Sequence, residues 1–104
     1  MLQEFTRDGR TIFTVTLSRL DAGLAAHLKA EFERLLPDAA EEIVIDLGQV
    51  GSIDSAGLGA LVSCYKLARP ERQLSLTSLN PTVQRVFRLT RMDRLIPIEQ
   101  GQTV

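Results

Sequence analysis

The sequence predicts a single α/β domain, with a mixed β-sheet, helices packed mainly on one of its faces and the element order ββαβαβαβ. Short apolar or alternating segments typical of strands are separated by longer segments with apolar residues at helical spacing. Strands and helices that alternate in this way form a sheet with right-handed crossovers. The chain has 104 residues, of which 44% are hydrophobic. This size allows one folded core and is too small for two domains.

The first predicted element is a β-hairpin at an edge of the sheet. Residues 2–7 and 10–17 flank Asp8-Gly9, a dipeptide that favours a two-residue hairpin turn. Apolar residues alternate with threonines over 13–17, which indicates a half-buried strand.

The next segment predicts a helix. Asp21 is a suitable N-cap for it, and Pro37 ends it. The residues predicted to share its buried face are Leu24, Leu28, Phe32 and Leu35.

Residues 43–47 predict a strand in the middle of the sheet, because only Asp46 interrupts an apolar run. A second helix is expected to begin near Gly57, with Leu58, Leu61, Val62 and Tyr65 on one face. It should run to about Arg69, where Pro70 stops it.

The last third of the chain repeats the alternation. Residues 74–77 predict a strand, and Asn80-Pro81 begins a third helix. Residues 95–98 predict a short last strand, placed at an edge because Pro97 cannot donate a ladder hydrogen bond. The domain is expected to span residues 1–104, with 99–104 as a frayed tail.

Composition excludes several classes of function. The net charge is −1 and no basic block is present, so binding to nucleic acid or to an anionic membrane is not expected. A single cysteine cannot form an internal disulfide, which fits a reducing compartment. No signal peptide and no apolar run of membrane length are seen, so we expect a cytoplasmic protein.

The loop between the central strand and the second helix is the candidate site. Ser55 stands at the carboxyl end of a strand and at the start of a helix, where sites are often built and where negative charge is favoured. Ser55 is therefore the candidate switch residue, although it could also be only the helix N-cap. Asp54 could cap the same helix or help to orient the hydroxyl. Gly57 and Gly59 allow either tight packing or the close approach of a partner.

Other chemistry finds little support in the sequence. Ser55 lacks the Gly-x-Ser-x-Gly setting of a hydrolase nucleophile, and His27 in the first helix is expected to be a surface or boundary residue. One His and one Cys do not make a metal site, and Cys64 is interpreted as a small apolar residue. Arg85, Arg88, Arg91 and Arg94 indicate either a solvated face or a surface for an acidic partner.

Five segments of the chain follow a family pattern: Leu20-Asp21-Ala22, residues 43–47, residues 53–61, Asn80-Pro81-Thr82-Val83 and Met92-Asp93. In this order they resemble the STAS domain family, and within it the small stand-alone bacterial anti-sigma factor antagonists. The Asp-Ser-x-Gly-Leu-Gly pattern in residues 53–61 is the most specific of them. The chain departs from the family at Ala56, where a second hydroxyl is common, and at Ser18 and Arg91, where glycine is frequent.

The resemblance implies a regulatory protein that is not an enzyme and holds no cofactor or metal. In similar proteins the serine at the position of Ser55 is phosphorylated by a partner that is both anti-sigma factor and serine kinase. The unphosphorylated form binds that partner, and a PP2C-type phosphatase reverses the modification. Nucleotide would belong to the kinase, which could also read Asp54 beside the serine. The expected contact residues are Asp54, Ser55, Ala56, Gly57, Leu58 and Gly59.

Two alternatives remain open. The chain could be an accessory STAS subunit of a transporter ATPase or of a larger signalling complex, without phosphorylation. A small enzymatic or nucleotide-binding α/β domain is the alternative of another class, against which the absence of a phosphate-cradling loop and of a second histidine argues.

Overall fold

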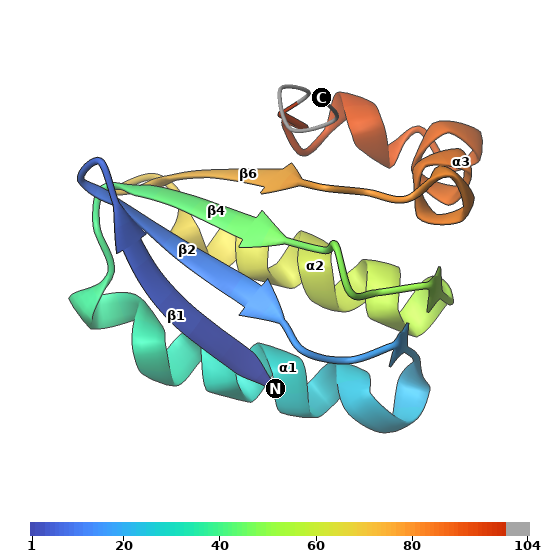
Figure 1. The fold of residues 1–104 in the computed structure, drawn as a ribbon, viewed down its shortest axis with the longest axis horizontal. Helices are drawn as coiled ribbons and strands as arrows, with labels where there is room; N and C mark the ends of the chain where they lie inside the picture. The colour runs from blue at the N-terminus through green and yellow to red at the C-terminus, as the bar shows by residue number, and fades with distance from the viewer. Residues whose placement is uncertain (100–104) are drawn as a thin grey trace.

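Four strands form a mixed sheet, and two helices cover one of its faces (Figure 1). The computed structural model describes residues 1–99. This architecture confirms the predicted fold class. The elements in chain order are β1 (Leu2–Arg7), β2 (Arg10–Val15), β3 (Arg19–Leu20), α1 (Ala22–Leu35), the 3₁₀ helix η1 (Leu36–Asp38), β4 (Glu42–Asp46), β5 (Ser52–Ile53), α2 (Ser55–Ala68), β6 (Gln73–Thr77), α3 (Pro81–Leu89) and the 3₁₀ helix η2 (Met92–Arg94).

The strands of the sheet lie in the order β1-β2-β4-β6, with β1 at one edge. β1 and β2 are antiparallel, whereas β4 is parallel to both β2 and β6. The expected hairpin is confirmed: Asp8 and Gly9 have φ values of 53° and 76°, as a two-residue turn with both central residues in the left-handed region requires.

The core lies between the sheet and the pair α1 and α2. The register aligns Phe13, Ile45 and Leu76 across β2, β4 and β6, and all three side chains are buried. Phe32 of α1 meets Phe13 edge-on, with ring centroids 5.7 Å apart. Leu61 brings α2 into the same cluster. The alternation of the strands and the 3.6-residue spacing of the helices therefore converge on one buried layer.

The predicted last strand is wrong. Of residues 95–98, only Ile98 forms a bridge, with Leu76 of β6. Pro97 takes part through its carbonyl, which accepts a hydrogen bond from the Leu76 N–H at 2.9 Å. The Glu99 N–H donates to the Leu76 carbonyl at 2.8 Å, so Glu99 is bound to the sheet and is not part of a frayed tail. The rest of that predicted tail, 100–104, lies outside the described residues.

A second, two-stranded sheet was not predicted. β3 and β5 pair in parallel, aligning Arg19 with Ser52 and Leu20 with Ile53. The Gly51 N–H extends the pairing with a hydrogen bond to the Ser18 carbonyl at 2.8 Å. Because β3 precedes α1 and β5 precedes α2, this small sheet holds the starts of both helices side by side.

Candidate functional site

The candidate site is the connection from β4 to α2, which leaves the carboxyl end of a central strand. Asp46 closes a turn after β4, because its Oδ1 accepts from the Gly48 N–H at 2.7 Å. The chain then runs through β5 to Asp54. From the other side, the Asn80 amide donates to the Val50 carbonyl at 2.9 Å, which ties the loop to the start of α3. Hydrogen bonds from the end of β4 and from the start of α3 therefore hold this loop in place.

Asp54 is the N-cap of α2 and also binds the start of α1. Its Oδ1 accepts from the Gly57 N–H at 2.9 Å, and its Oδ2 accepts from the Ala22 N–H at 3.2 Å. Each helix has unpaired N–H groups in its first turn, and one carboxylate satisfies one group from each helix. Of the interpretations left open by the sequence, the structure shows that Asp54 caps the start of α2.

Ser55 is the first residue of α2 and is exposed. The helix therefore begins two residues earlier than expected, and Ser55 is not its N-cap. Within residues 1–99, the Ser55 hydroxyl makes no hydrogen bond. The first turn of α2 contains no acidic residue, so the negative charge at its positive dipole end comes from the Asp54 carboxylate at the N-cap. The hydroxyl is thus accessible to a second protein and is not used by the fold.

The six expected contact residues do not share one surface. Gly57 and Leu58 are buried, Ala56 is half-buried, and Gly59 is exposed. A Cβ added to Gly57 would lie 2.2 Å from the Leu20 carbonyl oxygen, so this glycine allows α2 to pack closely on β3. The outward-facing set is reduced to Asp54, Ser55, Ala56 and Gly59.

The other polar candidates lie apart from Ser55. His27 is exposed on α1 and forms no hydrogen bond with Ser55. Cys64 is buried in α2, and burial raises the pKa of its thiol from 9.0 to about 12, so it stays protonated. Among residues 1–99, no group of three or more His, Cys, Asp or Glu side chains is placed to hold a metal ion.

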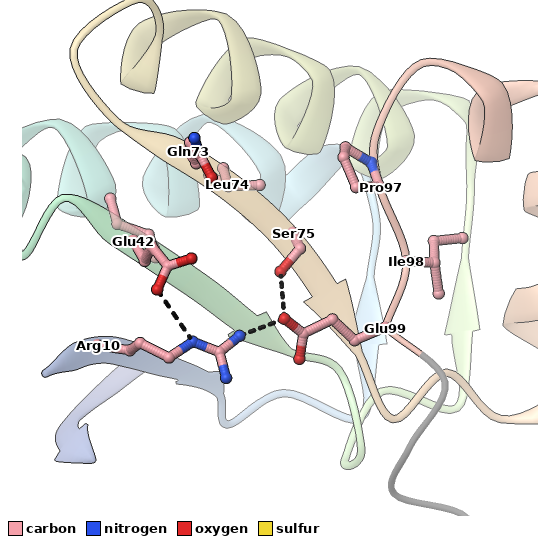
Figure 2. A pocket seen from close by; sticks show the side chains of 9 residues that line it. Arg10, Glu42, Gln73, Leu74, Ser75, Pro97, Ile98 and Glu99 are labelled. Atoms are coloured by element: carbon pink, nitrogen blue, oxygen red, sulfur yellow. Dashed lines mark hydrogen bonds and ion pairs between the residues drawn. The ribbon is translucent and has the colours of Figure 1, made fainter. Parts of the chain in front are cut away.

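A pocket that the sequence did not predict lies at the amino ends of the parallel strands (Figure 2). It has a volume of about 200 Å³. The Arg10 guanidinium donates to the Glu99 carboxylate, and the Ser75 hydroxyl donates to the same carboxylate at 3.2 Å. A carboxylate oxygen of Glu42 lies 4.0 Å from the Arg10 guanidinium. These residues come from segments far apart in sequence, so no local pattern could reveal the pocket. Its arginine is already bound by carboxylates of this chain.

No helix within the described part of the chain is both long and apolar enough to cross a membrane.

Comparison with known proteins identifies the family. The family described as "Mlab, STAS domain" matches residues 10–97. A candidate anti-sigma factor antagonist from Thermotoga maritima is 37% identical over 76 residues, which cover 70% of this chain and 67% of that protein.

Solved structures share the fold. An anti-sigma factor antagonist from Mycobacterium paratuberculosis superposes with a TM-score of 0.85 at 24% identity, covering 98% of this chain and 86% of that one. The anti-sigma factor antagonist SpoIIAA has a TM-score of 0.67 in its unphosphorylated form, at 16% identity, with 98% and 90% of the two chains covered. The phosphorylated form of SpoIIAA, described as a Bacillus cell fate determinant, gives 0.58 at 16% identity, with 98% and 94% covered.

The similarity thus extends over the sheet, all three helices and the β4–α2 connection, and the relatives reported above are described as anti-sigma factor antagonists. The chain belongs to the STAS domain family.

Proposed function

We propose that this chain is an anti-sigma factor antagonist, a single domain over residues 1–104 that binds an anti-sigma factor with serine kinase activity. It binds when Ser55 is free and is released when Ser55 is phosphorylated. A PP2C-type phosphatase restores the binding form. The observation that carries the proposal is the exposed Ser55 hydroxyl at the start of α2, which has no hydrogen bond within residues 1–99. The family and its described members support the same role.

Phosphorylation of Ser55 leaves the fold intact in this proposal. A phosphate adds about −1.5 to −2 charges at pH 7. The positive end of the α2 dipole stabilises such a charge by about 0.3–1 kcal/mol. Repulsion from the Asp54 carboxylate acts in the opposite direction, so the two effects largely offset each other. No hydrogen bond among residues 1–99 has to break, because Ser55 Oγ makes none.

Binding to the partner responds differently. A phosphate buried at an interface without matched cations costs several kcal/mol. A loss of about 3 kcal/mol weakens binding more than a hundredfold, because each 1.4 kcal/mol is a factor of ten. The chain supplies the acceptor serine and no catalytic group, and the nucleotide belongs to the kinase. A cytoplasmic location follows from a partner that controls a sigma factor.

The first prediction compares Ser55→Ala with Ser55→Asp. The partner is obtained from the native cell by pull-down with the Ser55→Ala protein and identified by mass spectrometry. Calorimetry should give Ser55→Ala a Kd within about twofold of the unphosphorylated wild type, unchanged by ATP. Ser55→Asp should bind about tenfold more weakly or worse, with an effect smaller than that of phosphate because it adds only one charge.

The matched control is Thr6→Asp, which adds the same charge on exposed β1, beside the hairpin turn at the opposite end of the sheet. It should leave the Kd unchanged. Equal binding by Ser55→Asp and wild type would refute the charge argument. An unmodified Ser55 after incubation with the true partner and ATP would instead favour an accessory STAS subunit.

A further inference from the structure

The outer side of α3 and the turn after it carry a row of arginines. Arg85 and Arg88 lie in α3, Arg91 follows its end, and Arg94 lies in η2. All four are exposed. The opposite side of α3 is fixed in the core by Val83 and Phe87, which are fully buried. The arginines therefore face solvent because the apolar side of the helix holds them there.

These four charges are not neutralised within the described part of the chain. The ion pairs among residues 1–99 join Arg10 to Glu42 and Glu99, and Arg19 to Asp21. Residues 81–95 contain one acidic residue, Asp93, against four arginines, a net charge of +3 in a chain whose total is −1. Positive charge is thus concentrated on α3 and the turn after it, in a chain that is otherwise acidic.

Arg91 supports a role for this charge beyond solubility. It follows the C-cap Thr90 in the left-handed conformation, with φ 62° and ψ 20°. Glycine is the residue that adopts this conformation at a helix end without steric cost. An arginine here costs stability and contributes the third positive charge of the row, which is the kind of local strain found at functional surfaces.

Two leucines lie among the arginines. Leu89 is 76% exposed and Leu95 is 39% exposed, and both are among the large hydrophobic side chains on the described surface. Protein interfaces combine apolar side chains with arginine in this way, because the guanidinium fork pairs with carboxylates while neighbouring apolar groups are covered.

We propose that this surface binds an acidic segment of a partner protein. The carboxylates of the segment pair with the arginines, and an apolar residue of the segment covers Leu89. Binding to a membrane is disfavoured because the apolar side of α3 is buried in the core. Only Leu89 and Leu95 of this surface would be able to insert into the lipid. The proposed surface, called the basic face below, consists of Arg85, Arg88, Leu89, Arg91, Arg94 and Leu95.

The basic face is separate from Ser55 but lies at the same end of the molecule. α3 packs against β5, and Asn80 at its start donates to Val50 in the loop before Asp54. Figure 1 shows α3 beside β5, the strand that leads into α2. A single large partner could cover both surfaces, yet binding at the basic face does not require Ser55 to be modified.

The second prediction tests this surface with a defined probe. The probe is a synthetic 20-residue amphipathic helical peptide in which glutamates surround a leucine stripe, measured by fluorescence anisotropy. The peptide should bind the full chain at low salt and more weakly as salt rises. The variant Arg85→Gln/Arg88→Gln/Arg91→Gln/Arg94→Gln should bind about tenfold more weakly or worse. NMR shift changes should fall on residues 81–95.

The matched control removes four exposed charges elsewhere, as Arg7→Gln/Lys29→Gln/Arg34→Gln/Lys66→Gln, and gives the same net charge. It should bind the peptide within about threefold of wild type. Should the basic-face variant fail to fold, Arg85→Gln/Arg88→Gln replaces it. Equal weakening in both variants, no binding by wild type, tighter binding to phosphatidylserine vesicles than to the peptide, or self-association through this face would each overturn the proposal.

Discussion

At the scale of single residues, Asp54 has a structural role, whereas its neighbour Ser55 is the residue proposed to be phosphorylated. The Asp54 carboxylate accepts one backbone N–H from each of two helices, at 2.9 and 3.2 Å. The hydroxyl of Ser55 makes no hydrogen bond among residues 1–99. Charge can therefore be added at Ser55 while the capping of both helices is kept.

The third prediction follows from this difference. Asp54→Ala should lower the free energy of unfolding by about 1–2 kcal/mol, because both helix starts lose an acceptor. Ser55→Ala should change it by less than about 0.5 kcal/mol. Urea unfolding followed by circular dichroism measures both. Equal losses in the two variants would show that the cap has been assigned to the wrong residue.

The sequence indicated this candidate site but did not separate the roles of Asp54 and Ser55. Asp and Ser are both good N-caps, so local preference does not decide between Asp54 and Ser55. The structure shows that Asp54 accepts from the Gly57 N–H. The same carboxylate also accepts from the Ala22 N–H, a contact across 32 positions that accompanies the pairing of β3 with β5 and that local preference cannot indicate. The exposure of Ser55 was predictable from its place after a buried strand. Its phosphorylation stays a prediction.

At the scale of elements, the contact between α2 and β3 depends on one glycine. Gly57 faces the Leu20 backbone, whereas Gly59 on the same helix faces open space. From the sequence, each of these two glycines could serve either tight packing within the domain or the close approach of a partner. Only the fold distinguishes them, because the β3 backbone that Gly57 contacts lies more than 30 positions earlier in the chain.

The fourth prediction uses these glycines as a matched pair. In Gly57→Ala the new Cβ would lie 2.2 Å from the Leu20 oxygen, so α2 must shift, at a cost of about 1–3 kcal/mol of unfolding free energy. Gly59→Ala should instead stabilise the protein by about 0.5–1 kcal/mol, because alanine favours the helix and meets nothing. Chemical denaturation gives both values. A stabilising Gly57→Ala would contradict the close packing.

The errors of the sequence prediction fall on the shortest elements. β3 and β5 have two residues each, too few to show alternation. Residues 95–98 do look like a strand, but a tight 3₁₀ turn precedes them and Pro97 contributes only its carbonyl to β6. Pairing of this kind is decided by neighbours in space, which a local pattern does not contain.

At the scale of the whole molecule, the two helices and the sheet enclose a single core in which Cys64 is 1% exposed. The longer elements of this core were predictable, because strand and helix periods persist over five or more residues. The fold also determines the chemistry of the thiol, since desolvation raises its pKa to about 12.

The fifth prediction concerns alkaline pH. The folded protein keeps the Cys64 thiol neutral up to about pH 12, whereas in the unfolded chain the thiol has its ordinary pKa of 9.0. The unfolded state then binds fewer protons, so the contribution of Cys64 to stability is complete below pH 9 and falls as pH rises towards 12, by up to about 1.4 kcal/mol per pH unit.

Denaturation of wild type and Cys64→Ala between pH 7 and 11 measures this effect. Wild type should be the more stable protein at pH 7, because alanine leaves a small cavity. The difference between the two proteins should narrow above pH 9. A constant difference across the range would mean that Cys64 is ionised in the folded state as well.

The cap at Asp54 also limits which kinases could act on this chain. The residues around Ser55 are locked into the first turn of a helix, with the Gly57 N–H already bound to Asp54. An enzyme that reads its target as an extended strand would find no such strand here. A kinase for Ser55 must instead recognise the folded shape, so a short linear copy of residues 50–60 would lack the features by which the protein is selected.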